Sequence, residues 1–299
     1  MARRVVPARV TAGRRERLCA EIGDQMGNPF RWLLVASTSA VVLSVLSLTV
    51  KPTAAQAPTY RAPRTADGKP NLNGIWQALN TANWDIQDHA ARPGPPQFGA
   101  LFSVPAGLAV VVGNEIPYQP WAVEKKKENL TNWLTADPEV NCYMPGVPRA
   151  TYIPHPFSVF QTPKYILMVY EFANATRTIY MDNPELESPA DTWMGHSRGR
   201  WEGETLVIDV TSFNGQTWFD RAGNFNSDAL HVVERYTHIS ADVLTYEATI
   251  EDPKVFTRPW KMSMPLYRRL EKNAQLTEFN CVPFAEELLY GYLRKQTSK

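Results

Sequence analysis

Seven short runs between residues 165 and 281 have the side-chain pattern of β-strands. Each run alternates apolar and polar residues or is rich in β-branched and aromatic ones. Most segments between the runs are too short for the helical crossovers that join parallel strands, so we expect antiparallel pairing. The runs are Tyr165–Phe172, Thr176–Asp182, Thr205–Thr211, Leu230–His238, Val243–Glu251, Trp260–Met264 and Gln275–Cys281.

The number and order of these runs predict a small barrel. With Gly74-Ile75-Trp76 as a first strand, about eight strands in meander order can close around one ligand-sized interior. Three of the connections have the composition of hairpin turns: Phe172–Thr176, Glu202–Glu204 and Ser240–Asp242. We therefore predict a mainly all-β fold, an antiparallel meander β-barrel.

Helices and irregular segments are expected on either side of the strands. Pro120 lies near the start of a predicted helix over residues 119–135, and Pro138 follows its end. Ala285–Lys295 has one apolar side and predicts a closing C-terminal helix. The Pro-rich residues 58–70 predict an extended arm, and residues 71–299 a single barrel domain that includes these decorations.

The first 57 residues are predicted to be an export signal. Leu33–Val50 is an uncharged run that follows Arg31 and precedes Ala54-Ala55-Gln56-Ala57, which is the layout of a secretory signal peptide. Met26 is an alternative start of this leader. An uncleaved membrane anchor is the alternative to cleavage.

Charge and cysteine content favour an exported protein without a nucleic-acid role. Residues 1–57 carry eight of the 31 Lys and Arg and three of the 30 Asp and Glu, which leaves 23 basic and 27 acidic residues. This slightly acidic balance attracts neither nucleic acid nor an anionic membrane. Removal of the signal also removes Cys19, and we expect Cys142 and Cys281 to form a disulfide, with two buried thiols as the alternative. The predicted location is periplasmic or secreted.

Polar and aromatic side chains are dense between Asp191 and Glu234, without a nucleotide loop, zinc-ligand spacing or nucleophile elbow. His196 lies between two glycines, where a loop could turn its imidazole toward a pocket. Asp220 lies in the next long loop, so His196 and Asp220 form a candidate acid–base or orienting dyad. The alternative is that Asp220 and Asn214 cap their own backbone turns.

The run that begins at His231 is a predicted strand, which places His231 and Glu234 on opposite faces. Either residue could be a buried ionisable group suited to acid–base chemistry, and the alternative is a structural ion network with an arginine. The candidate catalytic residues are therefore His196, Asp220, His231 and Glu234. The candidate ligand-binding residues are Trp193, Arg198, Asn214, Trp218, Arg221 and Tyr236.

A metal site would require several of the residues His155, His196, Asp220, His231 and Glu234 to converge. None of them shows metal-ligand spacing along the chain. We therefore predict no metal and no cofactor. The aromatic residues of the same region fit the wall of a pocket for a ring-bearing ligand, with ordinary core packing as the alternative.

Four motifs stand out in the chain: Trp193-Met194-Gly195-His196-Ser197-x-Gly199-x-Trp201-Glu202-Gly203, Asp220-Arg221-Ala222-Gly223-Asn224, His231-Val232-Val233-Glu234-Arg235 and Glu251-Asp252-Pro253-Lys254. Together they resemble a large, mostly uncharacterised family of exported bacterial proteins, over nearly all of the chain after residue 57. That resemblance implies export and brings no established reaction. Gly74-Ile75-Trp76 resembles the first strand of the calycins, the lipocalin-like barrels, which implies that Arg268 or Arg269 packs on Trp76.

The expected function is the binding of a small apolar or aromatic organic molecule in a barrel pocket of an exported protein. The alternative is an enzyme, a hydrolase, lyase or isomerase, that applies His, Asp and Glu acid–base chemistry to such a molecule. A rigid binding protein can dispense with ionisable groups in its pocket, whereas an acid–base enzyme cannot. The expected partner is a small molecule rather than nucleic acid, with membrane contact only through an uncleaved signal.

Overall fold

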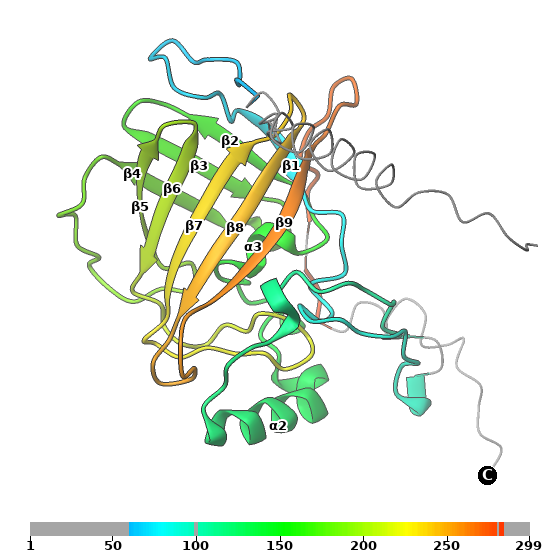
Figure 1. Ribbon diagram of the computed structural model, residues 1–299. Helices are drawn as coiled ribbons and strands as arrows, with labels where there is room; N and C mark the ends of the chain where they lie inside the picture. The colour runs from blue at the N-terminus through cyan, green and yellow to red at the C-terminus, as the bar shows by residue number, and fades with distance from the viewer. Residues whose placement is uncertain (1–59, 99–100, 280, 284–299) are drawn as a thin grey trace, which may run out of the picture. The chain divides into compact units, whose positions relative to one another are not determined.

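A computed structural model describes residues 60–98, 101–279 and 281–283, in which nine strands form a closed barrel (Figure 1). The mainly all-β fold and the barrel are therefore confirmed. The predicted signal over residues 1–57 and the predicted helix Ala285–Lys295 lie outside the described residues. The strands are β1 (Gly74–Gln77), β2 (Phe157–Gln161), β3 (Tyr165–Tyr170), β4 (Thr176–Met181), β5 (His196–Glu202), β6 (Thr205–Thr211), β7 (His231–His238), β8 (Val243–Glu251) and β9 (Trp260–Arg268); the α-helices are α2 (Pro120–Ala136) and α3 (Arg149–Tyr152).

Most predicted strands are present, and the three predicted hairpin turns join β3 to β4, β5 to β6 and β7 to β8. The strand β2 was not predicted. The strand β5 was not predicted either, because Gly195 and Gly199 favoured a loop. Gly199 instead faces the barrel interior, where an added Cβ would lie 2.6 Å from Met181 Sδ and 2.7 Å from Ile179 Cγ2.

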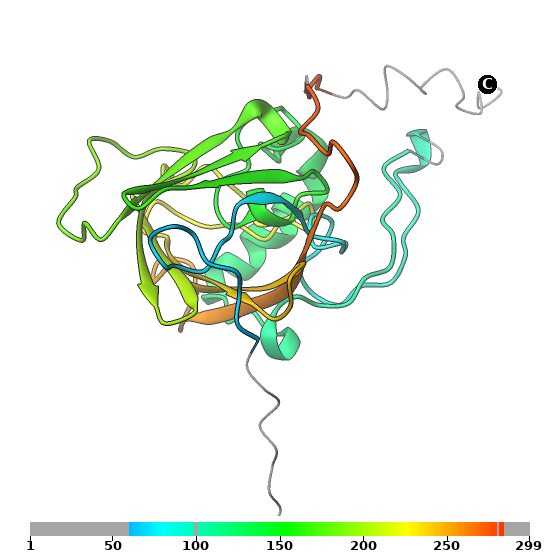
Figure 2. The same cartoon turned by 90° about the horizontal axis from the view of Figure 1, so that it is seen from above.

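One strand pair departs from the predicted antiparallel meander. β5 runs parallel to β4, with Ile179 opposite Ser197 and Met181 opposite Gly199. The connection between them, residues 182–195, projects from the side of the barrel (Figures 1 and 2). A segment of this length can span about 45 Å when extended, which is enough to return along β4 without a helix.

The predicted last strand, Gln275–Cys281, is not formed by residues 275–279 or 281, which have irregular backbone. Side chains hold this segment instead of a strand ladder. The Thr277 backbone N–H donates to Glu171 Oε2 at 2.8 Å, and Phe279 packs on His155 with ring centroids 4.4 Å apart. The segment ends in the predicted Cys142–Cys281 disulfide, which is confirmed with a Cα–Cα distance of 5.5 Å.

The residues Gly74 and Trp76 in β1 make room for an arginine from β9. The Arg268 guanidinium lies over the Trp76 ring at 4.2 Å, and its Nη1 donates to the Asn73 carbonyl at 2.6 Å. A Cβ at position 74 would overlap Arg268 Nη1, and Gly74 has a φ of 132°. The contact implied by the calycin resemblance is therefore present, and it is made by Arg268.

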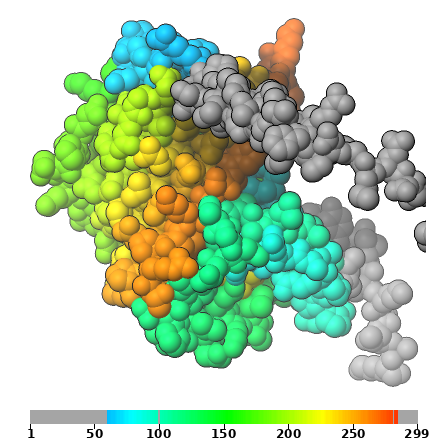
Figure 3. All heavy atoms as spheres, in the orientation of Figure 1, coloured from blue at the N-terminus to red at the C-terminus, as the bar shows by residue number. Residues whose placement is uncertain are grey.

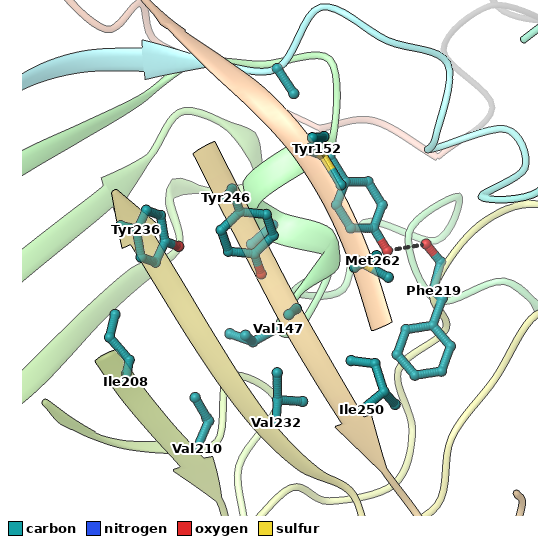
Figure 4. Close-up of a cluster of buried hydrophobic side chains, with 14 of the residues drawn as sticks. Val147, Tyr152, Ile208, Val210, Phe219, Val232, Tyr236, Tyr246, Ile250 and Met262 are labelled. Atoms are coloured by element: carbon teal, nitrogen blue, oxygen red, sulfur yellow. Dashed lines mark hydrogen bonds between the residues drawn. The ribbon is translucent and has the colours of Figure 1, made fainter. Parts of the chain in front are cut away.

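The barrel interior is filled by side chains rather than open. Alternation along β7 and β8 turns Val232, Tyr236 and Tyr246 inward, where each is no more than 1% exposed. All four residues of the short helix α3 are buried, and its Tyr152 donates a hydrogen bond to the Phe219 carbonyl at 2.7 Å (Figure 4). Burial of each such side chain contributes roughly 1.5–3 kcal/mol. The interior space predicted for a ligand is therefore occupied by core.

The predicted helix over residues 119–135 is confirmed as α2. The segment before α2 packs against the loop between β8 and β9, because Gln119 N donates to the Val255 carbonyl and Thr257 N donates to the Pro117 carbonyl, both at 2.8 Å. Figure 3 shows these two regions as neighbouring green and orange surfaces. Among the described residues, no helix combines the length and apolar character needed to cross a bilayer.

Candidate functional site

A cavity of about 390 Å³ lies where β4, the start of β5 and Met144 meet. Its volume falls in the range of small-molecule sites. Two of the predicted site residues, Trp193 and His196, line this cavity. The residues around it are Met144, Thr176, Arg177, Thr178, Tyr180, Thr192, Trp193, Met194, Gly195, His196 and Ser197, and we refer to it below as the β4–β5 cavity.

Two stacked ring pairs contribute to the β4–β5 cavity. Trp193 stacks on Tyr143 with centroids 5.0 Å apart and an interplanar angle of 6°. His196 stacks on Tyr180 with centroids 5.4 Å apart and an angle of 25°. Such pairs hold the rings in fixed orientations, so the aromatic wall exists before any ligand arrives.

Gly195 determines how the chain enters β5. It has a φ of 66°, and a Cβ there would lie 2.8–2.9 Å from Val210 Cγ1, Phe213 Cε1 and the Thr211 carbonyl oxygen. Only glycine avoids this crowding at a positive φ. The alternation that follows turns Ser197 into the barrel and leaves His196 half-buried at the cavity.

A buried ion pair lies behind the cavity, inside the barrel. Arg177 on β4 and Glu234 on β7 are 3% and 0% exposed, and Arg177 Nη2 donates to Glu234 Oε2. Arg177 Nε donates to Ser197 Oγ at 2.7 Å, whereas Arg177 Nη1 is buried and has no protein partner. The hydroxyls of Tyr236 and Tyr246 donate to Glu234 Oε1 at 3.1 and 2.9 Å.

The protonation states of this cluster follow from burial and charge. Burial, and after it the charge of Glu234, raises the pKa values of Tyr236 and Tyr246 well above their usual range. Burial alone would lower the pKa of Arg177, but Glu234 and the surrounding oxygens outweigh it and raise that pKa. The phenols therefore stay protonated and the guanidinium stays charged at neutral pH. Glu234 accepts hydrogen bonds from all three of these side chains.

His231 lies on the outer face of β7, opposite in direction to Glu234, as the strand alternation predicted. Its Nε2 is 3.0 Å from Asp209 Oδ2 and its Nδ1 is 3.2 Å from Glu251 Oε2. The hydrogen bond to Asp209 is the largest of the effects that raise the pKa of His231. Arg198 donates to the same Asp209 at 2.8 Å. These residues form the structural ion network considered as the alternative from the sequence.

Asp220 organises its own loop. Its Oδ1 accepts from the backbone N–H groups of Ala222 and Asn224, and its Oδ2 accepts from Ile86 N and from Asn224 Nδ2 at 2.5 Å. Burial, followed by the charge of Asp85, raises the pKa of Asp220 to about 7. The predicted dyad with His196 is therefore wrong, because Asp220 is fully buried among these donors and His196 Nε2 has no partner.

Three of the remaining predicted residues also lie away from the β4–β5 cavity. Arg221 donates to Glu139 at 2.8 and 3.0 Å and lies 4.4 Å above the Trp84 ring. Asn214 Oδ1 accepts from Gln216 N, so it caps a turn. Trp218 packs against the core. The sequence segment from Asp191 to Glu234 thus supplies several separate environments rather than one site.

Sequence reasoning missed Arg177, the charged residue of the β4–β5 cavity. A signal was present, because Arg177 shares its strand face with Ile179 and Met181, which are both buried. A charge in line with apolar residues on a strand indicates a buried and paired group. That pattern could have joined Arg177 to Glu234 before the structure was known.

No protein-family model, curated protein or solved structure matches this chain. Over residues 60–98, 101–279 and 281–283, no three His, Cys, Asp or Glu side chains are placed to hold a metal ion. Function therefore has to be inferred from the geometry of the cavity itself.

Proposed function

We propose that the protein is an exported binding protein that holds a small ring-bearing organic molecule in the β4–β5 cavity. The observation that carries this proposal is the lining itself, which combines stacked aromatic rings with two methionine side chains. Methionine adapts to irregular apolar shapes, and aromatic rings contribute large contact areas at little entropic cost. Both properties suit a pocket for an apolar or aromatic ligand.

Binding is better supported than catalysis because three of the four predicted acid–base groups are already engaged. Glu234 accepts from three donors, Asp220 accepts four hydrogen bonds, and His231 lies between two carboxylates. An enzyme that relied on proton transfer would need at least one of these groups free beside the substrate. The enzymatic alternative keeps one favourable observation, the presence of His196 in the cavity lining.

Two features support export, and a third supports a calycin-like relationship. The uncharged run Leu33–Val50 has the layout of a signal peptide, and the disulfide between Cys142 and Cys281 suits an oxidising compartment. The Arg268–Trp76 contact is the one that calycin barrels use between their closing and first strands. N-terminal sequencing of protein recovered from the periplasm tests export, with a mature chain expected to begin after Ala55 or Ala57.

Calorimetric titration of the full chain with a panel of ring-bearing compounds tests the binding proposal. For compounds that bind, Trp193→Ala should weaken affinity by roughly 10-fold or more, because it removes an aromatic wall. Trp121→Ala is the matched control, since Trp121 is 55% exposed and lies outside the cavity lining. Equal affinity of the wild type and Trp193→Ala for every bound compound would refute the site.

The same compounds distinguish binding from catalysis. An acid–base enzyme should convert at least one of them, and His196→Ala should then reduce turnover by about 10²- to 10⁴-fold without unfolding the protein. A binding protein should leave all of them chemically unchanged over long incubation. Product detected by mass spectrometry that disappears in His196→Ala would overturn the binding proposal in favour of the enzyme.

A further inference from the structure

A second cavity, of about 310 Å³, shares no lining residue with the β4–β5 cavity. His155 lines it together with four aromatic rings, those of Trp84, Phe102, Phe172 and Phe279. Its volume lies near the lower limit for small-molecule sites. We refer to it below as the His155 cavity.

Glu171 determines which nitrogen of His155 carries the proton. His155 Nδ1 is 3.2 Å from Glu171 Oε1, and Glu171 Oε2 accepts from the Thr277 backbone N–H at 2.8 Å. Burial, the largest single effect, would raise the pKa of Glu171, but the hydrogen bonds from Thr277 and His155 together lower it. An ionised carboxylate can only accept, so in the neutral imidazole Nδ1 carries the proton and Nε2 is an acceptor.

The other ring nitrogen of His155, Nε2, is available to a ligand. The side chain is 25% exposed, and Nε2 has no hydrogen-bond partner in the described part of the chain. Unlike Nε2 of His196, it is not closed off from solvent. A ligand in the His155 cavity can therefore bond to this nitrogen without displacing a protein group.

The rings around His155 form an apolar wall. The His155 centroid lies 4.4 Å from that of Phe279 and 5.8 Å from that of Phe172, and the two phenylalanine centroids are 5.2 Å apart. The disulfide between Cys281 and Cys142 anchors the segment that carries Phe279. A ring-bearing ligand can pack on this wall with its polar group beside Nε2.

The charged groups in the lining of the His155 cavity are already paired. Glu139, the one acidic residue in the described lining, accepts from Arg221 at 2.8 and 3.0 Å and from Arg149 at 3.3 Å. A cationic ligand would therefore find no unmatched carboxylate in this lining. The lining favours an uncharged ligand whose polar group donates a hydrogen bond.

We propose that the His155 cavity binds a phenol, whose hydroxyl donates to His155 Nε2 and whose ring packs against Phe172 and Phe279. A phenolic hydroxyl stays un-ionised at neutral pH, so it keeps the proton that it donates. It is attached directly to the ring, which suits a cavity of this small size. The site is separate from the β4–β5 cavity, so this inference goes beyond the proposed function and does not depend on it.

Three probes of similar size test the hydroxyl. Phenol, anisole and benzoate are compared by calorimetric titration of the full, oxidised chain. Phenol should bind about 10-fold tighter than anisole, because the ether cannot donate and leaves Nε2 unpaired. Benzoate should also bind more weakly than phenol, because an ionised carboxylate has no proton to donate.

Variants test whether His155 makes the contact. His155→Phe keeps a ring beside Phe279 and removes Nε2, so the ratio of phenol to anisole affinity should fall close to one. In Glu171→Gln the new amide can donate to Nδ1, which moves the imidazole proton to Nε2 and should lower the same ratio. His231→Phe is the control, because His231 also pairs with carboxylates but lies outside this lining, and it should leave the ratio unchanged. If His155→Phe does not fold, Glu171→Gln decides the outcome.

Several results would overturn the proposal. Equal affinity of the wild type for phenol and anisole would do so, as would tighter binding of benzoate or the failure of all three probes to bind. A phenol-to-anisole ratio that persists in His155→Phe would show that another group accepts from the hydroxyl. Phenol binding that is lost in Trp193→Ala but retained in His155→Phe would place the site in the β4–β5 cavity, against this inference and in favour of the proposed function.

Discussion

The ion pair between Arg177 and Glu234 offers the sharpest test of how the interior of this barrel is stabilised. The change is Glu234→Gln, which keeps the shape of the side chain and removes its charge. The amide oxygen of the variant can still accept from Arg177 Nη2, but Arg177 stays buried without a counter-charge. Breaking a buried ion pair by neutralising one partner costs about 3–5 kcal/mol.

That cost is large relative to the total stability of a folded domain. The free energy of unfolding of a globular domain is about 5–15 kcal/mol, so Glu234→Gln should remove a substantial share of it. The double variant Arg177→Met with Glu234→Gln should cost less than Glu234→Gln alone, because no buried charge is left unpaired. The comparison of single and double variants isolates the penalty of the orphaned charge from the loss of packing.

Urea unfolding followed by tryptophan fluorescence measures these differences, with the denaturant slope compared among the variants. Glu202→Gln is the control, because Glu202 pairs with Arg235 on the exposed barrel surface at 2.8 Å and should leave the unfolding midpoint unchanged. A loss below about 1 kcal/mol in Glu234→Gln would refute the reasoning, since an uncompensated buried charge should cost several times more. The reasoning would also be refuted if the double variant lost as much stability as Glu234→Gln and Arg177→Met lose separately when added together.

Three further predictions concern stability. Replacing Cys142 and Cys281 by serine should lower the free energy of unfolding by up to about 5 kcal/mol in the chain-entropy model, because the disulfide closes a separation of 139 residues. Urea titration measures this loss. A variant as stable as the oxidised wild type would contradict the prediction. Gly74→Ala should lower the melting temperature more than Gly113→Ala. Both positions have positive φ, but only at position 74 would the added Cβ contact Arg268. Equal decreases in melting temperature would show that Arg268 moves freely. The pKa of Asp220, about 7, is raised above its unfolded value, so its contribution to stability is complete below about pH 4 and is lost as pH rises through 7. Relative to Asp220→Asn, the wild type should therefore lose stability between pH 4 and 7 in urea titrations, and a gain over that range would show that the sign is wrong.

Local patterns in the sequence were sufficient for much of the barrel. Alternation along Thr205–Thr211 and Val243–Glu251 predicted β6 and β8 with the bounds they have in the structure. Pro120 marked the start of α2, and the pair Cys142 and Cys281 predicted the disulfide. Each of these features depends on residues close in the chain or on a count of cysteines, so no knowledge of the fold was needed.

Other features depend on which segments become neighbours in the fold. Short stretches of sequence do not show which segments those are. Gly199 looked like part of a loop until the structure showed that Met181 and Ile179 leave no room for a side chain there. The parallel pairing of β4 and β5 depends on a long connection returning along the barrel. Both outcomes are decided by packing between residues distant in sequence.

The candidate site likewise combines features that the sequence predicts with features that only the fold reveals. The sequence by itself determined that Trp193 and His196 lie in a segment rich in functional side chains, and that His231 and Glu234 occupy opposite faces of one strand. Only the tertiary structure decided that Asp220 is enclosed by its own loop and that Arg177, not Asp220, shares a cavity with His196. The physical reason is that burial and hydrogen-bond partners determine what an ionisable group can do, and both are set by the packing of distant strands and loops.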